Sequence, residues 1–295
     1  MKHKLEYALF CLLIGFIRVL PLRLGIWVGS LLGKIHYLVD SRHRRLTITH
    51  LQLAFGRTKT LSELKQIAWD SYQSQGMSLA ESIYLPRMGL SKIQEWVSVD
   101  GLSYYAEAVK KGKGVIILTA HLGNWEIIPK AFLAHSFRIY GTVRPLNNPY
   151  LDKISRRWRE KNGMGVINKR EDTHRILKLL RQGEAVGFLL DQNTHEKEAV
   201  FVDFFGQEAA TNKGVAILAL RSDATVLPVF MRREAEGHRM IIDPPLDLIR
   251  TGSNKDDILS ATALFTKTIE LHITQNPEQW LWIHRRWKTK RSRDT

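Results

Sequence analysis

The sequence predicts an α/β fold, with a mainly parallel central sheet covered by helices and an N-terminal helical membrane-associating region. Two observations predict the sheet: β-rich runs alternate with helical stretches, and runs such as 114–120 and 185–191 are mostly apolar. Continuous apolar runs are typical of strands buried on both faces, as in parallel sheets covered by helices. The third observation is a long, interrupted apolar segment at the N-terminus, which predicts association with a membrane.

The composition is that of a folded protein with a strong positive charge. Of 295 residues, 44% are hydrophobic and 25% are charged, which excludes a disordered or collagen-like chain. The 44 Lys and Arg residues exceed the 29 Asp and Glu residues, giving a net charge of +15, so we expect a polyanionic partner: nucleic acid, an anionic membrane or a phosphorylated ligand. The single cysteine, Cys11, excludes an intrachain disulfide and a thiolate metal cluster.

The N-terminal apolar segment is too interrupted for a simple transmembrane helix. Crossing a bilayer takes about 20 mostly apolar residues, but the run from Tyr7 to Ile17 is followed by Arg18, and Arg23 precedes the second run. We therefore expect a tilted span or a helix pair lying in the interface, with Arg18 reaching towards the headgroups. A signal peptide and a buried helix pair with a solvated basic end are the alternatives.

A basic cluster, Arg42, Arg44 and Arg45, follows this segment. Positive residues beside a membrane segment are retained in the cytoplasm, which predicts a cytoplasmic location for the rest of the chain. We expect residues 1–45 to form a membrane-anchoring helical region and residues 46–295 to form one α/β domain.

The remaining elements follow from capping signals and periodicity. Thr60 and Glu63 have the spacing of a capping box and predict a helix to about residue 85; Ser91 and Gln94 repeat the signal for a shorter helix. We predict strands at 114–120, 137–143, 164–167, 185–191, 225–231 and 238–243, and helices at 124–133, 150–161, 173–181, 212–221 and 255–274. Pro228 lacks an N–H, which predicts an edge position or a bulge for its strand.

His121 and Glu126 flank a turn at the end of the first predicted core strand. The carboxyl ends of parallel strands are where α/β proteins bind ligands. On one continuous helix these side chains would be about 140° apart, but Gly123 and Asn124 predict a turn that lets them face each other. A carboxylate can then fix the imidazole tautomer while the other ring nitrogen takes a proton from a hydroxyl.

The alternative is a structural turn histidine with Glu126 favoured by a helix dipole. No HExxH pattern or matching ligand spacing accompanies the pair, so we expect no metal site.

The chain contains, in order, the blocks HLGNWE (121–126), VRPLNNPYLD (143–152), LLDQN (189–193), FFGQEAATNKG (204–214) and WLWIHRRWK (280–288). Together they resemble the bacterial lipid A biosynthesis acyltransferases, the lauroyl and myristoyl transferases of the lysophospholipid acyltransferase superfamily. A bare His-x4-Glu is weakly specific, but five blocks in register over nearly the whole chain are specific. The resemblance favours the lipid A branch, because many glycerolipid relatives have Asp where this chain has Glu126.

The resemblance implies a membrane-associated enzyme at the cytoplasmic face of the inner membrane. It would move a fatty acyl chain from acyl carrier protein to a hydroxyl of a phosphorylated glycolipid acceptor, a lipid A precursor of the Kdo-lipid IVA type in lipopolysaccharide biosynthesis. The resemblance further implies that His121 is the general base, that Glu126 is its partner, and that the acyl-acyl carrier protein is a co-substrate with no other cofactor. Another glycolipid acceptor, of the phosphatidylinositol mannoside type, and a non-catalytic protein binding an anionic membrane are the alternatives.

Six further residues are candidates for substrate binding. Arg144 and Asn148 follow the second core strand, and Asp191 and Gln192 end a buried strand, so these four are expected at the same sheet edge as His121. The resemblance adds Arg159, in a basic helix, and Arg170 belongs to a basic pair after a short strand; both are suited to phosphate groups. We expect a hydrophobic groove beside His121 with a basic rim.

The C-terminal segment interleaves Trp280, Trp282 and Trp287 with Arg285, Arg286 and Lys288. Aromatic residues beside cations suit a membrane headgroup interface. They also suit single-stranded nucleic acid, but no nucleic-acid motif accompanies them, and we expect no nucleic-acid partner.

Overall fold

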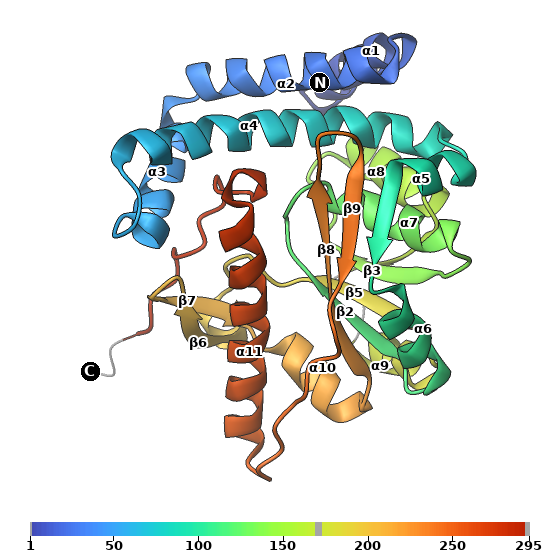
Figure 1. The fold of residues 1–295 in the computed structure, drawn as a ribbon, viewed down its shortest axis with the longest axis vertical. Helices are drawn as coiled ribbons and strands as arrows, with labels where there is room; N and C mark the ends of the chain where they lie inside the picture. The colour runs from blue at the N-terminus through green and yellow to red at the C-terminus, as the bar shows by residue number, and fades with distance from the viewer. Residues whose placement is uncertain (1, 169–172, 293–295) are drawn as a thin grey trace.

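A seven-stranded sheet forms the centre of the protein in the computed structural model, which describes residues 2–168 and 173–292 (Figure 1). The strand order is β1-β9-β8-β2-β5-β3-β4, and neighbours run parallel except for the β8–β9 pair. The strands are β1 (Val97–Asp100), β2 (Val115–Thr119), β3 (Ile139–Val143), β4 (Met164–Asn168), β5 (Ala185–Leu189), β8 (Thr225–Arg233) and β9 (His238–Ile242). The predicted mainly parallel α/β fold is confirmed.

Helices cover both faces of this sheet. They are α1 (Lys2–Val19), α2 (Leu22–Val39), α3 (Ser41–Phe55), α4 (Leu61–Tyr84), α5 (Leu90–Trp96), α6 (Leu102–Lys110), α7 (Ile128–Ala134), α8 (Pro149–Lys161), α9 (Thr173–Arg181), α10 (Gly214–Ser222) and α11 (Asn254–Gln275). The 3-10 turns include η1 (Leu85–Arg87), η2 (Trp125–Ile127) and η4 (Pro277–Gln279). The antiparallel hairpin β6 (Ala199–Phe204)–β7 (Gln207–Asn212), which the sequence analysis did not predict, packs against α11 (Figure 1).

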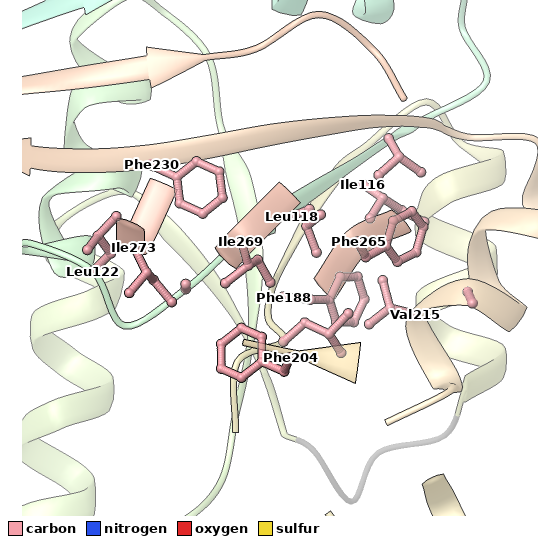
Figure 2. Close-up of a cluster of buried hydrophobic side chains, with 14 of the residues drawn as sticks. Ile116, Leu118, Leu122, Phe188, Phe204, Val215, Phe230, Phe265, Ile269 and Ile273 are labelled. Atoms are coloured by element: carbon pink, nitrogen blue, oxygen red, sulfur yellow. The ribbon is translucent and has the colours of Figure 1, made fainter. Parts of the chain in front are cut away.

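Strand β2 shows why the apolar runs form central strands, because all five of its residues are buried. Ile116 and Leu118 belong to a cluster with α10, α11 and the C-terminal segment, in which Phe265 and Ile269 of α11 pack (Figure 2). Val115, whose side chain points to the other face of the strand, belongs to a second cluster with α5, α6 and α7. Alternate side chains of β2 thus reach opposite faces of the sheet, and both faces are buried in apolar clusters.

Pro228 lies inside the sheet, so the prediction of an edge position or bulge is wrong. Strand β8 pairs with β2 up to Leu118↔Pro228 and with β9 from Val229 onward. The carbonyl of Pro228 accepts a bond from the N–H of Asp243, beyond the end of the β8–β9 pairing. The missing N–H therefore falls where the ladder ends and no partner strand requires it.

Helix α4 begins as predicted, with reciprocal bonds between Thr60 and Glu63. Helix α5 begins two residues earlier than expected, with Gly89 in place of Ser91 as the N-cap, and has no side-chain cap. The long helix α4 crosses one end of the sheet and carries α2 on its other side (Figure 1). It therefore lies between α2 and the sheet.

Helix α2 packs on α4 through glycines. Gly25, Gly29 and Gly33 recur every fourth residue and are the buried residues of α2. A methyl group at Gly33 would collide with the backbone carbonyl of Tyr72, and one at Gly29 would collide with that of Gly76. The absence of side chains thus permits direct backbone contact between the two helices, a geometry common in helices that pack within membranes.

Many large apolar side chains of α1 and α2 are exposed, although Ile14 and Ile17 of α1 are buried. Exposed residues occur every three or four positions: Leu5, Leu9, Leu12, Phe16 and Val19 in α1, and Leu24, Trp27, Leu31, Ile35 and Leu38 in α2. Within the described residues, none of the helices combines the length and hydropathy that a membrane span requires. The expected boundary between residues 45 and 46 falls inside α3, and the anchoring role of residues 1–45 stays a prediction.

We predict that Gly33→Ala destabilises the protein by about 1 to 3 kcal/mol, because the added methyl group overpacks the α2–α4 contact. Gly15→Ala in α1 is the control, since a methyl group there meets no heavy atom within 4 Å; it should be neutral or stabilising by up to about 1 kcal/mol. Chemical unfolding followed by circular dichroism measures both. Equal stability of the two variants would contradict the close α2–α4 contact.

Candidate functional site

The register of β2 and β5 brings His121 and Asp191 together. These strands are parallel neighbours, and Thr119 pairs with Leu189 at their carboxyl ends. His121 and Asp191 each lie two residues beyond those ends, where Nδ1 of His121 is 2.8 Å from Oδ1 of Asp191. The backbone N–H of His121 donates to Oδ2 of the same carboxylate at 3.0 Å. Two adjacent strands thus place the imidazole and the carboxylate at the predicted ligand edge.

Asp191 is a buried, ionised carboxylate. Burial opposes its ionisation, but the His121 imidazole, the indole N–H of Trp280 and the His121 N–H outweigh this and lower the pKa of Asp191 to about 2. An ionised carboxylate only accepts hydrogen bonds, so Nδ1 of His121 carries the hydrogen. In a neutral ring, Nε2 is then left as the acceptor.

Glu126 is bonded to Arg159 and not to the His121 ring, in contrast to the expected His121–Glu126 pair. Nε of Arg159 donates to Oε2 of Glu126 at 3.1 Å, and Nη2 donates to Oε1 at 2.5 Å. The turn that begins at Gly123 leads into η2, from which Glu126 points to α8. The carboxylate that fixes the imidazole is Asp191, which the sequence analysis assigned to substrate binding.

The free side of the imidazole faces Gln192 and Trp125. Nε2 of His121 is 3.3 Å from Nε2 of Gln192, so the Gln192 amide can donate to it. The Trp125 ring centroid lies 4.7 Å from that of His121, in an edge-to-face arrangement. His121 remains 15% exposed, and its Nε2 is therefore placed to take a proton from a bound hydroxyl.

The C-terminal segment holds the turn that carries His121. Gly123 has φ of +57°, and a Cβ there would meet the carbonyl of Met231, so the turn requires glycine. The Gly123 N–H donates to the carbonyl of Gln279 at 3.0 Å, and the Leu281 N–H donates to the carbonyl of His121 at 3.2 Å. The position of His121 thus depends on residues far along the chain.

A buried ion cluster lies beside the same turn. Glu81 of α4 pairs with both Nη atoms of Arg233 and lies 3.1 Å from Nε2 of His238. Burial opposes its ionisation, but His238 and Arg233 lower the pKa of Glu81 to about 2. Its Oε2 also accepts a bond from Nδ2 of Asn124 at 2.9 Å. The cluster fixes α4, β8 and β9 to the turn between His121 and Glu126.

The C-terminal tryptophans lie in the core, so the prediction that they form a headgroup interface is wrong. Trp280 and Trp282 are fully buried, and Trp287 is 7% exposed. Arg286 is buried as well, because its guanidinium donates to the carbonyl of Ala210 and to the Thr211 hydroxyl. These bonds give both Nη atoms an acceptor inside the protein, whereas Nε is buried without one. Trp280 belongs to the site because its indole N–H bonds Asp191. In the sequence, only its place in the fifth block indicated such a role.

Of the other predicted substrate-binding residues, Arg144 and Asn148 have no hydrogen bond or ion pair with His121. Arg144 is exposed at the end of β3. Asn148 is buried as the N-cap of α8, and its amide donates to the carbonyl of His3 and to Glu6. Arg170 lies outside the described residues. The assignment of these three residues to substrate stays a prediction.

An apolar cavity of about 430 Å³ lies beside this site. Trp125, Glu126 and Arg159 line it, and its other walls are mainly apolar side chains of α1, α4 and α8, including Phe10, Leu79, Leu151, Ile154 and Trp158. The volume is in the range of small-molecule binding pockets. A hydroxyl or carbonyl bound near Trp125 would therefore have an apolar space for an attached chain.

No group of three or more His, Cys, Asp or Glu side chains that could hold a metal ion occurs within residues 2–168 and 173–292.

Comparison with known proteins covers almost the whole chain. A model of the bacterial lipid A biosynthesis acyltransferase family matches residues 2–289. The lipid A biosynthesis palmitoleoyltransferase of Escherichia coli (strain K12) is 30% identical over 274 residues, which are 92% of this chain and 87% of that protein. The lauroyltransferase of the same strain is 27% identical over 266 residues (89% and 85%), and the myristoyltransferase is 25% identical over 264 residues (88% and 80%). The matched region includes the site and the N-terminal helices.

We predict that Asp191→Asn removes a pH-dependent contribution to stability. Because the pKa of Asp191 is depressed in the folded state, its ionisation stabilises the protein above its usual pKa of about 3.9, and this is lost as the pH falls towards 2. The loss over that interval should be about 2 kcal/mol.

Urea unfolding between pH 7 and pH 3 measures the difference between wild type and Asp191→Asn. This difference should be constant above about pH 5 and should shrink below pH 4. Asp256→Asn, the same substitution at an exposed position of α11, is the control. A wild-type advantage that persists unchanged down to pH 3 would contradict the ionised buried carboxylate.

Proposed function

The chain belongs to the bacterial lipid A biosynthesis acyltransferase family, and on that premise we propose that it transfers a fatty acyl chain from acyl-acyl carrier protein to a hydroxyl of a lipid A precursor of the Kdo-lipid IVA type. Membership by itself supports acyl transfer in lipid A biosynthesis. The donor, the acceptor and the mechanism are our proposals. The observation that carries them is the His121–Asp191 pair beside an apolar cavity.

In the proposed mechanism His121 is the general base. Nδ1–H is held by Asp191, so Nε2 accepts the proton of the acceptor hydroxyl as its oxygen attacks the thioester carbonyl. The imidazolium formed is stabilised by the ionised carboxylate of Asp191. Nε2 of His121 is the atom that Gln192 contacts. When the hydroxyl binds there, the Gln192 side chain either moves aside or bonds to the substrate oxygen, because its amide has both donors and an acceptor.

The reaction balances without another cofactor. The new bond joins the acceptor oxygen to the acyl carbon, and collapse of the tetrahedral intermediate breaks the carbon–sulfur bond of the thioester. The proton on His121 then passes to the departing thiolate, which restores the neutral imidazole. The products are an ester and the thiol of the carrier protein.

Arg159 and the apolar cavity supply the two remaining requirements of this reaction: donors for the substrate oxygens and a space for the acyl chain. Glu126 uses Nε and one donor of Nη2 of Arg159, which leaves guanidinium donors for a carbonyl oxygen or a phosphate of the substrates. We assign Glu126 to positioning Arg159. The apolar walls formed by α1, α4 and α8 would receive an acyl chain while its reacting group lies near Trp125.

We also propose that α1 and α2 lie in the cytoplasmic face of the inner membrane. Helix α2 buries glycines and exposes Trp27 and Leu31, the reverse of a helix in an aqueous protein. A contiguous exposed apolar surface of this kind is typical of membrane contact. Phe10 of α1 lines the apolar cavity, so a lipid leaving the bilayer along α1 would reach the site.

We predict that purified wild-type protein raises the mass of a tetra-acylated Kdo-containing disaccharide lipid by one acyl group when supplied with acyl-acyl carrier protein. His121→Ala should lower the rate by about 10² to 10⁴-fold or more, because the base is lost. Asp191→Asn should cause a loss in the same range, because the imidazole loses its orienting carboxylate. Mass spectrometry of the product follows each reaction.

His195→Ala, the same substitution at an exposed histidine, is the control and should keep full activity. Undiminished turnover by His121→Ala would overturn the general-base assignment. No product from wild type with any donor chain would overturn the proposed acceptor and favour another glycolipid.

We predict that Leu31→Glu weakens binding to vesicles containing anionic phospholipid by several-fold or more, because a charged side chain replaces an apolar one in the contact surface. Leu259→Glu in α11 is a matched control, since both leucines are 41% exposed. Vesicle co-sedimentation measures both. Equal binding by the two variants would show that α2 does not contact the membrane.

A further inference from the structure

A second cavity, of about 490 Å³, lies between α1, η1 and α8. Four cationic side chains line it, Arg18, Arg87, Arg157 and Lys161, together with apolar residues that include Ile154 and Trp158. No carboxylate is among its lining residues. We call it the cationic cavity.

Within residues 2–168 and 173–292, no carboxylate neutralises the charges of the cationic cavity. Other arginines of α8 are paired: Arg156 bonds Asp152, and Arg159 bonds Glu126. Within the described part of the chain, Arg18, Arg87, Arg157 and Lys161 have no acidic partner within 4.0 Å. Four cations around one space repel one another, so an anion in that space would be stabilised.

Arg18 is the most constrained of the four. Its guanidinium carbon lies 5.4 Å from the centre of the Trp158 ring, and its Nε is buried without a hydrogen-bond partner. Burial and the charge of Arg87 lower the pKa of Arg18. Nε of Arg233 and Nε of Arg286 are buried without a partner as well, so the unpaired Nε of Arg18 supports an anion site only together with the four cations around the cavity.

The cationic cavity adjoins the apolar cavity beside His121. Ile154 and Trp158 line both cavities, so α8 forms their common wall. Ile154, Arg157, Trp158 and Lys161 are three or four residues apart and share one face of this helix. Val19, at the end of the exposed apolar face of α1, lines the cationic cavity too. An anion reaching it is therefore expected to be part of an amphiphile.

We propose that the cationic cavity binds a phosphate group carried by a lipid. Arginine guanidinium groups match phosphate oxygens in a bidentate manner, and three arginines with one lysine suit a group of charge near −2. The apolar residues Ile14 and Val19 contact the lipid part nearest the phosphate. That this lipid is the acyl acceptor rests on the proposed function, whereas the phosphate site itself rests on the cavity alone.

The test measures binding in neutral detergent by titration calorimetry, without acyl transfer. The probes are a doubly phosphorylated, acylated glucosamine disaccharide, the same lipid without phosphates, and phosphatidylglycerol. Arg157→Gln, at an exposed position, should weaken binding of the phosphorylated disaccharide by about tenfold or more, as expected for a lost charge-assisted bond. Binding of the phosphate-free lipid should not change. Arg18→Gln should behave in the same way.

Lys153→Gln is the matched control, because it removes one exposed cation from α8 outside both cavities. A loss restricted to the phosphorylated disaccharide identifies the acceptor as the source of the phosphate; an equal loss for phosphatidylglycerol identifies a membrane headgroup. Both outcomes support a phosphate site. Binding by Arg157→Gln and Arg18→Gln equal to that of Lys153→Gln, or an equal loss for the phosphate-free lipid, would overturn it.

Kinetics separate this proposal from the proposed function. If wild type acylates the disaccharide lipid and Arg157→Gln leaves the KM for that acceptor unchanged, the acceptor is not the lipid held in the cationic cavity, and the proposed function stands. If wild type transfers no acyl chain but Arg157→Gln still loses phosphate-dependent binding, the function is wrong and the site stands.

Discussion

The buried negative charge of Asp191 is the constraint on which the site depends. A carboxylate removed from water is stable only when several donors surround it. Here the imidazole and N–H of His121 come from the end of β2, and the indole N–H of Trp280 comes from the C-terminal segment. The carboxylate itself follows β5. Three parts of the chain must therefore meet before the charge is satisfied, and the same contacts orient the imidazole.

A second buried charge performs a similar task on the other side of the turn. Glu81 joins α4 to Arg233 of β8, to His238 of β9 and to Asn124. Buried ion clusters of this kind give little net stability compared with apolar packing, but they define one arrangement of their partners. Because α4 also carries α2, this cluster connects the helices with exposed apolar side chains to the turn that holds His121.

Local sequence predicted six of the seven strands of the central sheet but missed β1, α6 and the β6–β7 hairpin, and it did not predict which strands are neighbours. The apolar runs and the Thr60–Glu63 box were sufficient for β2, β5 and the start of α4. That Asp191 meets His121 depends on β5 lying next to β2, and that Glu126 meets Arg159 depends on the position of α8, which are both long-range properties of the fold. The tryptophan-rich segment was misread because its cation, Arg286, finds carbonyl and hydroxyl acceptors inside the protein.

The contribution of the C-terminal segment has a consequence for protein synthesis. His121 and Asp191 emerge from the ribosome long before Trp280 and Leu281, the residues that complete the carboxylate shell and hold the His121 carbonyl. While the chain is growing, the sheet can form but its reactive edge lacks these bonds. The imidazole thus acquires its fixed orientation only after the C-terminal segment has been synthesised and has packed against the end of the sheet.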